Sequence, residues 1–228
     1  MLTSRSRRSA ALALTFVVLG SAAASAHPHV FIQNRSDVVF NDDGKIVALA
    51  IEWAFDKDYS AVATEGLDAN EDGFYSAGEL EPLARENLKA LKDYDYFVYA
   101  KLGKDKLAYG EVTEFGQILT DNVLKMYFTV PLKQPVDPAK NEFSYMIYDP
   151  SFFIAIDYPD ASAVSSVGSK PANCAVELKK PPSDEETAQT RQMLSEKSAD
   201  WQPETEQDFG SLFAQPVAVT CKPKTAQN

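Results

Sequence analysis

The chain of 228 residues has only two histidines, His27 and His29, and only two cysteines, Cys174 and Cys221. Nucleophilic catalysis needs a base beside the nucleophile, and ordinary triads take that base from histidine. Because both histidines lie close together near the N-terminus, such a triad has few candidates. The sequence also contains no Gly-x-Ser-x-Gly elbow, no phosphate-binding glycine loop and no His-Glu-x-x-His motif. We therefore expect a protein that is not an enzyme.

The sequence also contains no long apolar run. One short apolar run lies near the N-terminus. Three arginines precede an apolar stretch from Ala10 to about Leu19, and small residues follow it up to Ala26. This order is typical of a secretory signal peptide that is cleaved after Ala26. No segment approaches the roughly 18–20 apolar residues that a spanning helix requires. We expect residues 1–26 to be lost on export to the periplasm, through the general secretory route or through the twin-arginine route that Arg7-Arg8 also suggests.

Basic residues are scarce relative to acidic ones. Loss of residues 1–26 removes three of the 22 Lys and Arg and none of the 33 Asp and Glu, which leaves a net charge of −14. Such an acidic chain repels nucleic acid and anionic membrane surfaces, and it attracts cations. We therefore expect divalent metal ions among its partners and no nucleic acid.

Oxygen-bearing side chains in residues 68–79 follow the spacing of an EF-hand calcium loop. In such a loop, side chains at positions 1, 3, 5 and 12 bind the ion, position 7 contributes its backbone carbonyl, position 9 binds directly or through a water, and a glycine at position 6 permits the sharp turn. The residues at positions 1, 3, 5, 6, 7, 9 and 12 are Asp68, Asn70, Asp72, Gly73, Phe74, Ser76 and Glu79, and Tyr75 at position 8 is the usual apolar anchor. We predict that the loop binds one calcium ion.

Part of this segment has a simpler explanation. Ser76 and Glu79 form the S-x-x-E pattern of a capping box, and apolar residues at helical spacing follow from Leu80 to Leu91. A polar turn before a helix does not require the acidic and amide residues at 68–72 with Gly73, so the calcium interpretation is favoured. The sequence has no second loop of this kind. A single loop in an exported protein more often holds a structural ion than acts as a sensor, because sensor loops usually work in coupled pairs.

The two cysteines each lie in a run typical of β structure. These runs read Ala-Asn-Cys-Ala-Val-Glu-Leu around Cys174 and Pro-Val-Ala-Val-Thr-Cys up to Cys221. In an oxidising compartment an even pair of cysteines predicts a disulfide. The alternative, a metal site with thiolate ligands, would need further ligands that the sequence does not place nearby.

Apolar and polar residues alternate through most of the mature chain, which predicts a β-rich α+β fold. Residues 29–40 and 45–55 should form a hairpin, because Asn41-Asp42-Asp43-Gly44 is a strong turn signal. A helix-loop-helix unit at about 56–92 interrupts the strands. Further strands are expected at 94–102, 107–115, 123–132, 142–148 and 152–158, in a predominantly antiparallel sheet or sandwich.

The C-terminal part is more polar. A peripheral helix is expected from about 184 to 199, after Pro181 and Pro182, and the last strand should end at Cys221. We interpret residues 27–222 as a single domain with the helix-loop-helix unit inserted, and residues 223–228 as a frayed tail.

The histidines suggest a second metal site. Cleavage after Ala26 would make His27 the first residue, so its amino group and its imidazole could bind one metal, and His29 on the same face of an extended strand could add a nitrogen. Nickel, cobalt, zinc and copper all accept such ligands. Pro28 has no backbone N–H, so carboxylates elsewhere would have to complete the site. Alternatively, both histidines are solvated or pack at the edge of the first strand.

Several segments together resemble a known family. They are His-Pro-His-Val-Phe-Ile at 27–32, Ile-Glu-Trp at 51–53, the calcium-type loop, Ile-Tyr-Asp-Pro-Ser-Phe-Phe at 147–153 and the terminal Val-Ala-Val-Thr-Cys. The chain resembles the domain-of-unknown-function family numbered 1007 over nearly its whole mature length. Members of that family are often labelled as periplasmic components of uncharacterised ABC-type transport systems and tend to be encoded beside nickel or cobalt permeases. The resemblance implies a periplasmic accessory of divalent-metal transport, with an inner-membrane permease as a partner.

Three functions follow from these features. The leading one is a non-enzymatic periplasmic protein that binds or hands over a divalent metal, with calcium fixing its fold. The second is a calcium-stabilised interaction module that contacts a membrane protein and carries no metal cargo. The third is a copper enzyme that uses the processed N-terminal histidine, although the second histidine is then only two residues away, which does not give the usual geometry of such sites.

Overall fold

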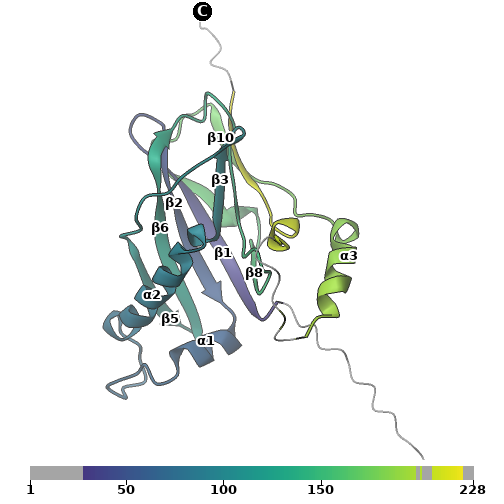
Figure 1. Ribbon diagram of the computed structural model, residues 1–228. Helices are drawn as coiled ribbons and strands as arrows, with labels where there is room; N and C mark the ends of the chain where they lie inside the picture. Colours follow the sequence, from purple (N-terminus) through teal and green to yellow (C-terminus); the bar gives the residue numbers. More distant parts are fainter. Residues whose placement is uncertain (1–27, 199–200, 202–206, 223–228) are drawn as a thin grey trace, which may run out of the picture.

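The computed structural model describes residues 28–198, 201 and 207–222 (Figure 1). The predicted signal peptide, His27 and the predicted tail at 223–228 lie outside the described residues. Among the described residues, no helix is both long enough and apolar enough to cross a membrane. The predicted β-rich α+β fold class is confirmed. The described residues form two sheets with mainly antiparallel pairing and three α-helices.

The first two strands form the predicted hairpin. β1 (Val30–Phe40) pairs antiparallel with β2 (Ile46–Phe55), from Ile32 opposite Phe55 to Phe40 opposite Ile46. The turn forms because Asn41 Oδ1 accepts hydrogen bonds from the N–H groups of Asp43 and Lys45, at 3.1 and 2.9 Å. Gly44 takes φ +73°, a left-handed conformation that glycine adopts without steric cost.

Sheet A contains six strands and is mixed. Its order is β5 (Phe115–Thr120), β6 (Val123–Val136), β2, β1 and β8 (Ile154–Asp157), and β9 (Val164–Gly168) also pairs with β1. β8 and β9 run parallel to β1 and pair with successive parts of it. The remaining pairs are antiparallel, so the sheet is predominantly antiparallel, as predicted.

Sheet B contains five strands, and each neighbouring pair in it is antiparallel. Its order is β10 (Cys174–Leu178), β11 (Val217–Cys221), β7 (Phe143–Ile147), β3 (Val98–Leu102) and β4 (Asp105–Lys106). In the β10–β11 pair Cys174 lies opposite Cys221. These two cysteines form a disulfide, so the predicted pairing is confirmed.

The inner faces of the two sheets share one hydrophobic core. Along β1 every second residue from Val30 to Phe40 is buried, which matches the two-residue period of a strand with one covered face. Trp53, Phe128 and Tyr145 are the largest side chains with almost no exposed surface. One group of hydroxyls pairs within the core: Ser36 Oγ lies 2.7 Å from the Tyr145 hydroxyl and 3.1 Å from that of Tyr158. Burial raises the pKa of Tyr158 to about 12, so its hydroxyl stays neutral.

Two helices cover part of sheet A. α1 (Lys57–Thr64) and α2 (Ala77–Lys92) follow β2 directly, at the position predicted for the helix-loop-helix unit, and lie against β5 and β6 in Figure 1. α2 buries one face through Leu80, Ala84, Leu88 and Leu91, at the helical spacing that the sequence shows.

The third helix, α3 (Asp184–Ser195), lies on the opposite side of the molecule (Figure 1) and confirms the predicted peripheral helix. Short 3₁₀ turns complete the fold at η1 (Asp95–Phe97), η2 (Ala161–Ala163) and η3 (Gly210–Leu212).

The prediction of a strand at 107–115 is wrong. This segment contacts β6 through an isolated bridge between Tyr109 and Leu132, and regular pairing begins only at Phe115. Its path is held by a side chain: the Tyr109 hydroxyl donates to the Val98 carbonyl at 2.8 Å and accepts from the Ala100 N–H at 2.9 Å. Burial raises the pKa of Tyr109 to about 12, which keeps the proton needed for this double role.

The predicted strand at 94–102 begins later than expected, at Val98. Asp95, Tyr96 and Phe97 have φ values of 52°, 57° and 57°, so three consecutive non-glycine residues are left-handed. Such a turn is costly and persists only where packing enforces it. Tyr96 and Phe97 are buried in the core, and this burial offsets the strain.

Candidate calcium site

Residues 68–79 run from the connection between α1 and α2 into the first turn of α2. The side chain of Asp68, at position 1, holds the backbone of the loop in its turn. Asp68 Oδ1 accepts from the N–H of Asp72 at 3.2 Å, and Asp68 Oδ2 accepts from the N–H of Gly73 at 2.9 Å. Gly73 has φ +80°, and a Cβ at this position would meet no atom within 4 Å, so backbone conformation and not crowding requires glycine there. The acid at position 1 is thereby tied to positions 5 and 6.

The side chains at positions 3 and 5 continue this pattern. Asn70 Oδ1 accepts from the N–H of Asp72 at 3.0 Å, and Asp72 Oδ1 accepts from the N–H of Phe74 at 2.8 Å. The Asn70 amide also donates to Asp72 Oδ2 at 2.9 Å. The side-chain oxygens at positions 1, 3 and 5 are therefore turned toward the loop's own backbone. The side chain of Phe74, whose predicted contribution is its carbonyl, is 77% exposed.

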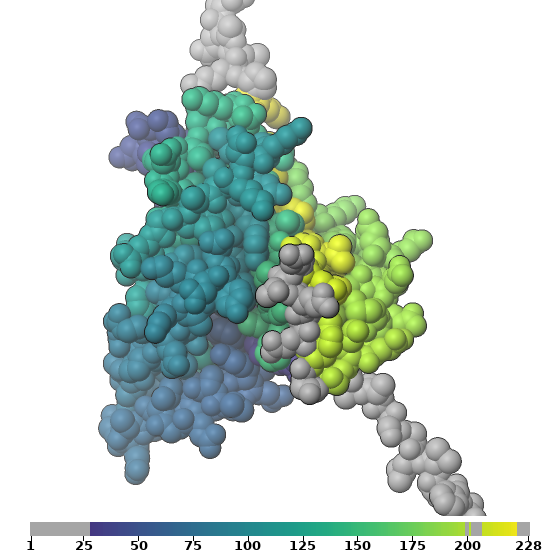
Figure 2. Space-filling view, in the orientation of Figure 1, coloured from purple at the N-terminus to yellow at the C-terminus, as the bar shows by residue number. Residues whose placement is uncertain are grey.

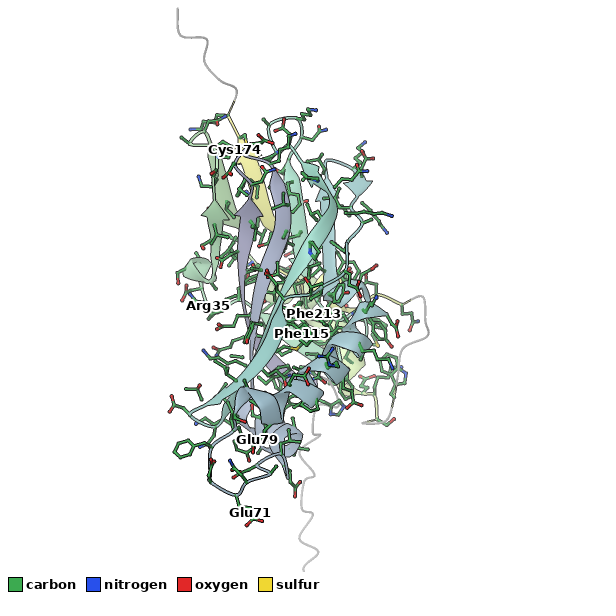
Figure 3. All side chains as sticks on the ribbon, turned by 90° about the vertical axis from the view of Figure 1, so that its left-hand side faces the viewer. Arg35, Glu71, Glu79, Phe115, Cys174 and Phe213 are labelled. Atoms are coloured by element: carbon green, nitrogen blue, oxygen red, sulfur yellow. A yellow bond between two sulfur atoms is a disulfide. The ribbon has the colours of Figure 1, made fainter. Side chains whose placement is uncertain are left out.

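Glu79 joins the two ends of the loop. Its Oε2 accepts from the N–H and the hydroxyl of Ser76, both at 2.8 Å, and its Oε1 accepts from the N–H of Ala69 at 3.0 Å. Ser76 Oγ in turn caps α2 by accepting from the Glu79 N–H, so the predicted capping box is present. Positions 2, 9 and 12 are thus linked through one carboxylate, which Figure 3 shows at the end of the molecule where the loop lies.

Hydrophobic contacts attach the loop to the domain. Tyr75, the predicted apolar anchor at position 8, is half-buried and packs against the hydrophobic core, as does Leu67 just before the loop. The helix that precedes the loop is itself tied to sheet A. Asp56 caps α1 and also accepts from the N–H of Phe31, and Ser60 Oγ accepts from the N–H of Leu124 at 3.0 Å. The conformation of the loop is therefore coupled to sheet A.

The predicted histidine site can be followed at His29 only, since His27 lies outside the described residues. The His29 side chain is exposed, and its ring packs on that of Phe153 with centroids 4.7 Å apart. Its backbone N–H donates to the Phe153 carbonyl at 2.8 Å. His29 therefore packs at the edge of the first strand, which is the arrangement expected by the alternative interpretation of the histidines.

Comparison with known proteins identifies the family. The sequence profile of the family described as "Protein of unknown function (DUF1007)" matches residues 12–221, which is most of the chain. The chain belongs to the DUF1007 family. The family membership that the sequence resemblance predicted is therefore confirmed.

Two relatives match different shares of this DUF1007 chain. A protein of Haemophilus influenzae, described as uncharacterized, is 26% identical over 200 residues, which cover 86% of this chain and 92% of the relative. A protein of Spirochaeta aurantia, described as an uncharacterized 15.5 kDa protein in the trpE 3' region, is 34% identical over 86 residues. That match covers 38% of this chain and 61% of the relative.

The donor set of the DUF1007 loop suits calcium in its chemistry. Calcium takes six to eight oxygen ligands, mainly carboxylates, amides, carbonyls and waters, and the loop offers such groups together with the Ser76 hydroxyl. Within residues 28–198, 201 and 207–222, however, no group of three or more His, Cys, Asp or Glu side chains is arranged so that it could hold a metal. The carboxylate oxygens accept hydrogen bonds from N–H groups of the loop instead. Calcium binding would therefore draw the carboxylates of Asp68, Asp72 and Glu79 closer together.

A second polar cluster was not found by sequence reasoning. The Tyr148 hydroxyl donates to Asp208 Oδ2 at 2.9 Å, and the Tyr148 ring stacks on Tyr99 at 4.2 Å. These residues line a cavity of about 380 Å³ on sheet B. Burial, and then the carboxylate of Asp208, raise the pKa of both tyrosines. No local pattern could have indicated the cluster, because Asp208 comes from a distant irregular segment.

The segment that follows Tyr148 forms a turn at residues 150–153. Asp149 is buried, and its carboxylate accepts from the N–H and hydroxyl of Ser151 and from the N–H of Ile154. Phe152 takes φ +57° and stacks on Phe213 at 4.0 Å. The Tyr-Asp-Pro-Ser-Phe-Phe segment therefore has a structural role that accounts for its composition.

The capping role of Glu79 predicts a pH dependence. Hydrogen bonds from the N–H and hydroxyl of Ser76 hold the pKa of Glu79 below its ordinary value of 4.5. A carboxyl group whose pKa is lowered by folding stabilises the native state above its unfolded pKa, and this contribution is lost as the pH falls through the folded pKa. In the absence of calcium, Glu79→Gln should therefore lower the free energy of unfolding in urea at pH 7. The difference in this free energy between the variant and wild type should vanish at a pH below the folded pKa of Glu79.

The other capping box supplies the control. In α3, Ser183 lowers the pKa of Glu186 in the same way, so Glu186→Gln should show the same pH dependence. If the free energies of unfolding of Glu79→Gln and wild type differed by a constant amount through the acid range, the capping explanation would be contradicted.

Proposed function

We propose that this DUF1007 protein is an exported calcium-binding protein and that it serves as a periplasmic accessory of divalent-metal transport. The observation that carries the calcium part is the placement of oxygen donors at positions 1, 3, 5 and 12 of the loop, with the glycine turn at position 6. Asp68, Asn70, Asp72, Phe74, Ser76 and Glu79 would hold the ion.

The calcium ion would have a structural role. The loop follows a helix that is hydrogen-bonded to both β1 and β6, and it precedes a helix that covers β5. An ion that draws positions 1, 5 and 12 together would fix the two helices relative to each other. The loop is the only one of its kind in the sequence, which favours a fixed structural ion over a sensor.

Export is supported by two independent features. The N-terminal sequence has the order of a signal peptide, and the disulfide between Cys174 and Cys221 is typical of proteins that fold in an oxidising compartment. A protein that is exported to the periplasm would carry such a signal peptide and would fold where such a disulfide can form.

Two features support the transport role. The mature chain is acidic, and members of the DUF1007 family tend to be encoded beside nickel or cobalt permeases. An inner-membrane permease would be the partner, and the metal cargo would be nickel, cobalt, zinc or copper. Elemental analysis of the protein purified from its native periplasm tests the proposal as a whole. Stoichiometric calcium together with a transition metal is the expected result. Calcium without any transition metal would favour the second function, an interaction module without metal cargo.

The metal cargo would bind through the N-terminal histidines. Isothermal titration of the mature protein, with His27 as its first residue, should show binding of at least one of nickel, cobalt, zinc and copper. The double variant His27→Ala, His29→Ala should bind at least about tenfold more weakly, because transition metals bind imidazole nitrogen more strongly than isolated carboxylates.

The N-terminal amino group provides a matched control. A protein that retains Ala26 keeps both imidazoles but moves the amino group away from His27, so its affinity should fall between those of the mature protein and the double variant. Unchanged affinity in the double variant would remove the histidines from the proposal.

A further inference from the structure

The cavity of about 380 Å³ on sheet B has charged residues of both signs in its wall. The wall combines residues of β3 and β4 with the end of β7 and with Asp208 and Ser211 from the C-terminal part of the chain. In Figure 2 the teal surface around β3 lies next to the yellow surface of this C-terminal part. Neither the loop at 68–79 nor His29 lines the cavity, so it is separate from the candidate metal sites.

Carboxylates and a tyrosine hydroxyl form one end of the cavity. The Tyr148 hydroxyl donates to Asp208 Oδ2 at 2.9 Å, and the N–H of Ser211 donates to Asp208 Oδ1 at 3.0 Å. Asp95, just before β3, is exposed and lines the same cavity. Burial raises the pKa of Tyr99, and the carboxylates of Asp208 and Asp95 raise it further. Both carboxylates therefore lie near the Tyr99 hydroxyl, and this end of the cavity is negative.

Two lysines form the other end. Lys101 lies directly opposite Lys106 in the β3–β4 pair, and both line the cavity. Like charges directly opposite each other on neighbouring strands are destabilising. Neither ammonium group forms an ion pair within the described part of the chain. An anionic group of a ligand would relieve this repulsion.

The two ends are separated along β3. Neither lysine forms an ion pair with Asp95 or Asp208, although all four residues line one cavity. Tyr99, beside the carboxylates, and Lys101 are two residues apart on one face of the strand, which corresponds to roughly 6.5 Å. Two residues of an extended peptide span roughly the same distance. A dipeptide therefore matches the spacing, whereas both charged groups of a free α-amino acid are attached to one carbon.

The wall between the two ends is aromatic and apolar. The Tyr99 ring stacks on that of Tyr148 with centroids 4.2 Å apart, Met146 lies opposite Tyr99 on β7, and Leu107 adds a further apolar side chain. Aromatic rings pack favourably against one another, so an aromatic side chain of a ligand suits this wall. The volume lies within the range of about 300–1,000 Å³ that is typical of small-molecule sites.

We infer that this cavity binds a dipeptide with free termini and an aromatic side chain. The ammonium group of the peptide lies against the carboxylates of Asp95 and Asp208. Its carboxylate group lies between Lys101 and Lys106, and its aromatic side chain packs beside Tyr99. The peptide runs parallel to β3, and its two charged groups neutralise the two ends of the cavity.

The dipeptide Phe-Gly and its two blocked forms test the proposal. N-acetyl-Phe-Gly lacks the ammonium group, and Phe-Gly-amide lacks the carboxylate. In an NMR titration Phe-Gly should shift the backbone amide signals of β3, with a dissociation constant of about 1 mM. Each blocked form should bind about fivefold more weakly, which is the factor for one partly exposed ion pair.

Variants of single charges assign the two ends. Asp95 has φ 52°, and asparagine tolerates this left-handed conformation, so Asp95→Asn keeps the turn. This variant should weaken binding of Phe-Gly and of its amide about fivefold, and it should not weaken binding of N-acetyl-Phe-Gly. Lys106→Gln should instead weaken binding of Phe-Gly and of its N-acetyl form, and it should not weaken binding of the amide.

Lys104 provides the matched control. It lies in the turn between β3 and β4 and does not line the cavity, so Lys104→Gln should leave the affinities for all three peptides unchanged. Absence of β3 shifts with Phe-Gly would overturn the proposal, and so would equal affinities for the free and the blocked peptides. The same conclusion would follow if Lys106→Gln weakened binding of the amide as much as that of the free dipeptide.

Discussion

Calcium at about 10 mM should raise the melting temperature of the mature protein by about 5–10 °C, and Glu79→Gln should remove most of this rise. Calcium sites in extracellular modules have dissociation constants of about 10⁻⁴–10⁻³ M, so this concentration reaches about 100 times the tighter value. Binding to the native state then adds about 2.7 kcal/mol to the free energy of unfolding. For a chain of this size, each kcal/mol shifts the melting temperature by about 2–4 °C.

The choice of Glu79 follows from its position. A carboxylate at position 12 binds calcium with both oxygens, whereas glutamine offers one oxygen and no charge. In the loop, Glu79 already joins Ala69 to Ser76, and in the proposed calcium-bound loop the same residue would supply the closing ligand. Its loss would therefore remove both the proposed ligand at position 12 and the closure on which the other proposed ligands depend.

Glu186→Gln is the matched control for calcium. It weakens a capping box of the same kind at α3, so it should lower the melting temperature slightly and leave the rise with calcium intact. Magnesium is the second control, because it demands near-octahedral geometry and dehydrates reluctantly, and it should give a smaller rise. An equal rise in Glu79→Gln and wild type, or no heat of calcium binding by titration, would contradict the assignment of the loop.

Local patterns in the sequence were sufficient for those elements whose contacts are local. The hairpin follows from the Asn41–Gly44 turn and from alternation on either side, and both helix-capping serines are followed three residues later by glutamate. The turn that begins at Asp68 is also local, because Asp68, Asn70 and Asp72 accept hydrogen bonds from N–H groups of the same loop. Its calcium binding stays a prediction. The disulfide was predicted from the even number of cysteines and from the expectation that the protein is exported to an oxidising compartment.

Long-range contacts account for what was not predicted. β9 pairs in parallel with β1, although it is a short polar segment of serines and valines whose position depends on a strand about 130 residues earlier. The segment at 107–115 alternates like a strand, but the Tyr109 hydroxyl ties it to β3 instead. The unpaired Nε1 of the buried Trp53 was equally hidden, because a tryptophan in a strand gives no sign in the sequence that its N–H will lack a hydrogen-bond partner among the described residues.

Removal of the disulfide by the double substitution Cys174→Ser, Cys221→Ser should lower the free energy of unfolding by about 4 kcal/mol, which makes it the most destabilising change considered. The cysteines are 47 residues apart, and a closed loop of that length restricts the unfolded chain by about this amount in the chain-entropy model. Urea unfolding of the double variant and of wild type, with and without a thiol reductant, measures the effect.

The location of the disulfide determines how the loss should appear. β10 lies at the edge of sheet B and pairs there with β11, while β11 also pairs with β7 and buries Val217 and Val219 completely in the core. Hydrogen exchange should therefore accelerate most in β10, whereas the amides of β7 should keep their protection relative to global unfolding.

The candidate calcium loop at 68–79 and the disulfide should act independently. Figure 3 places Glu79 and Cys174 at opposite ends of the molecule, and well-separated sites are usually additive within about 0.3–0.5 kcal/mol. The double cysteine variant should therefore retain the full rise in melting temperature with calcium, and reductant should have no further effect on its urea midpoint. If instead the variant unfolded at the wild-type urea concentration, the disulfide would not restrict the unfolded chain as proposed. If it lost its response to calcium, the two ends of the domain would be coupled through the core that they share.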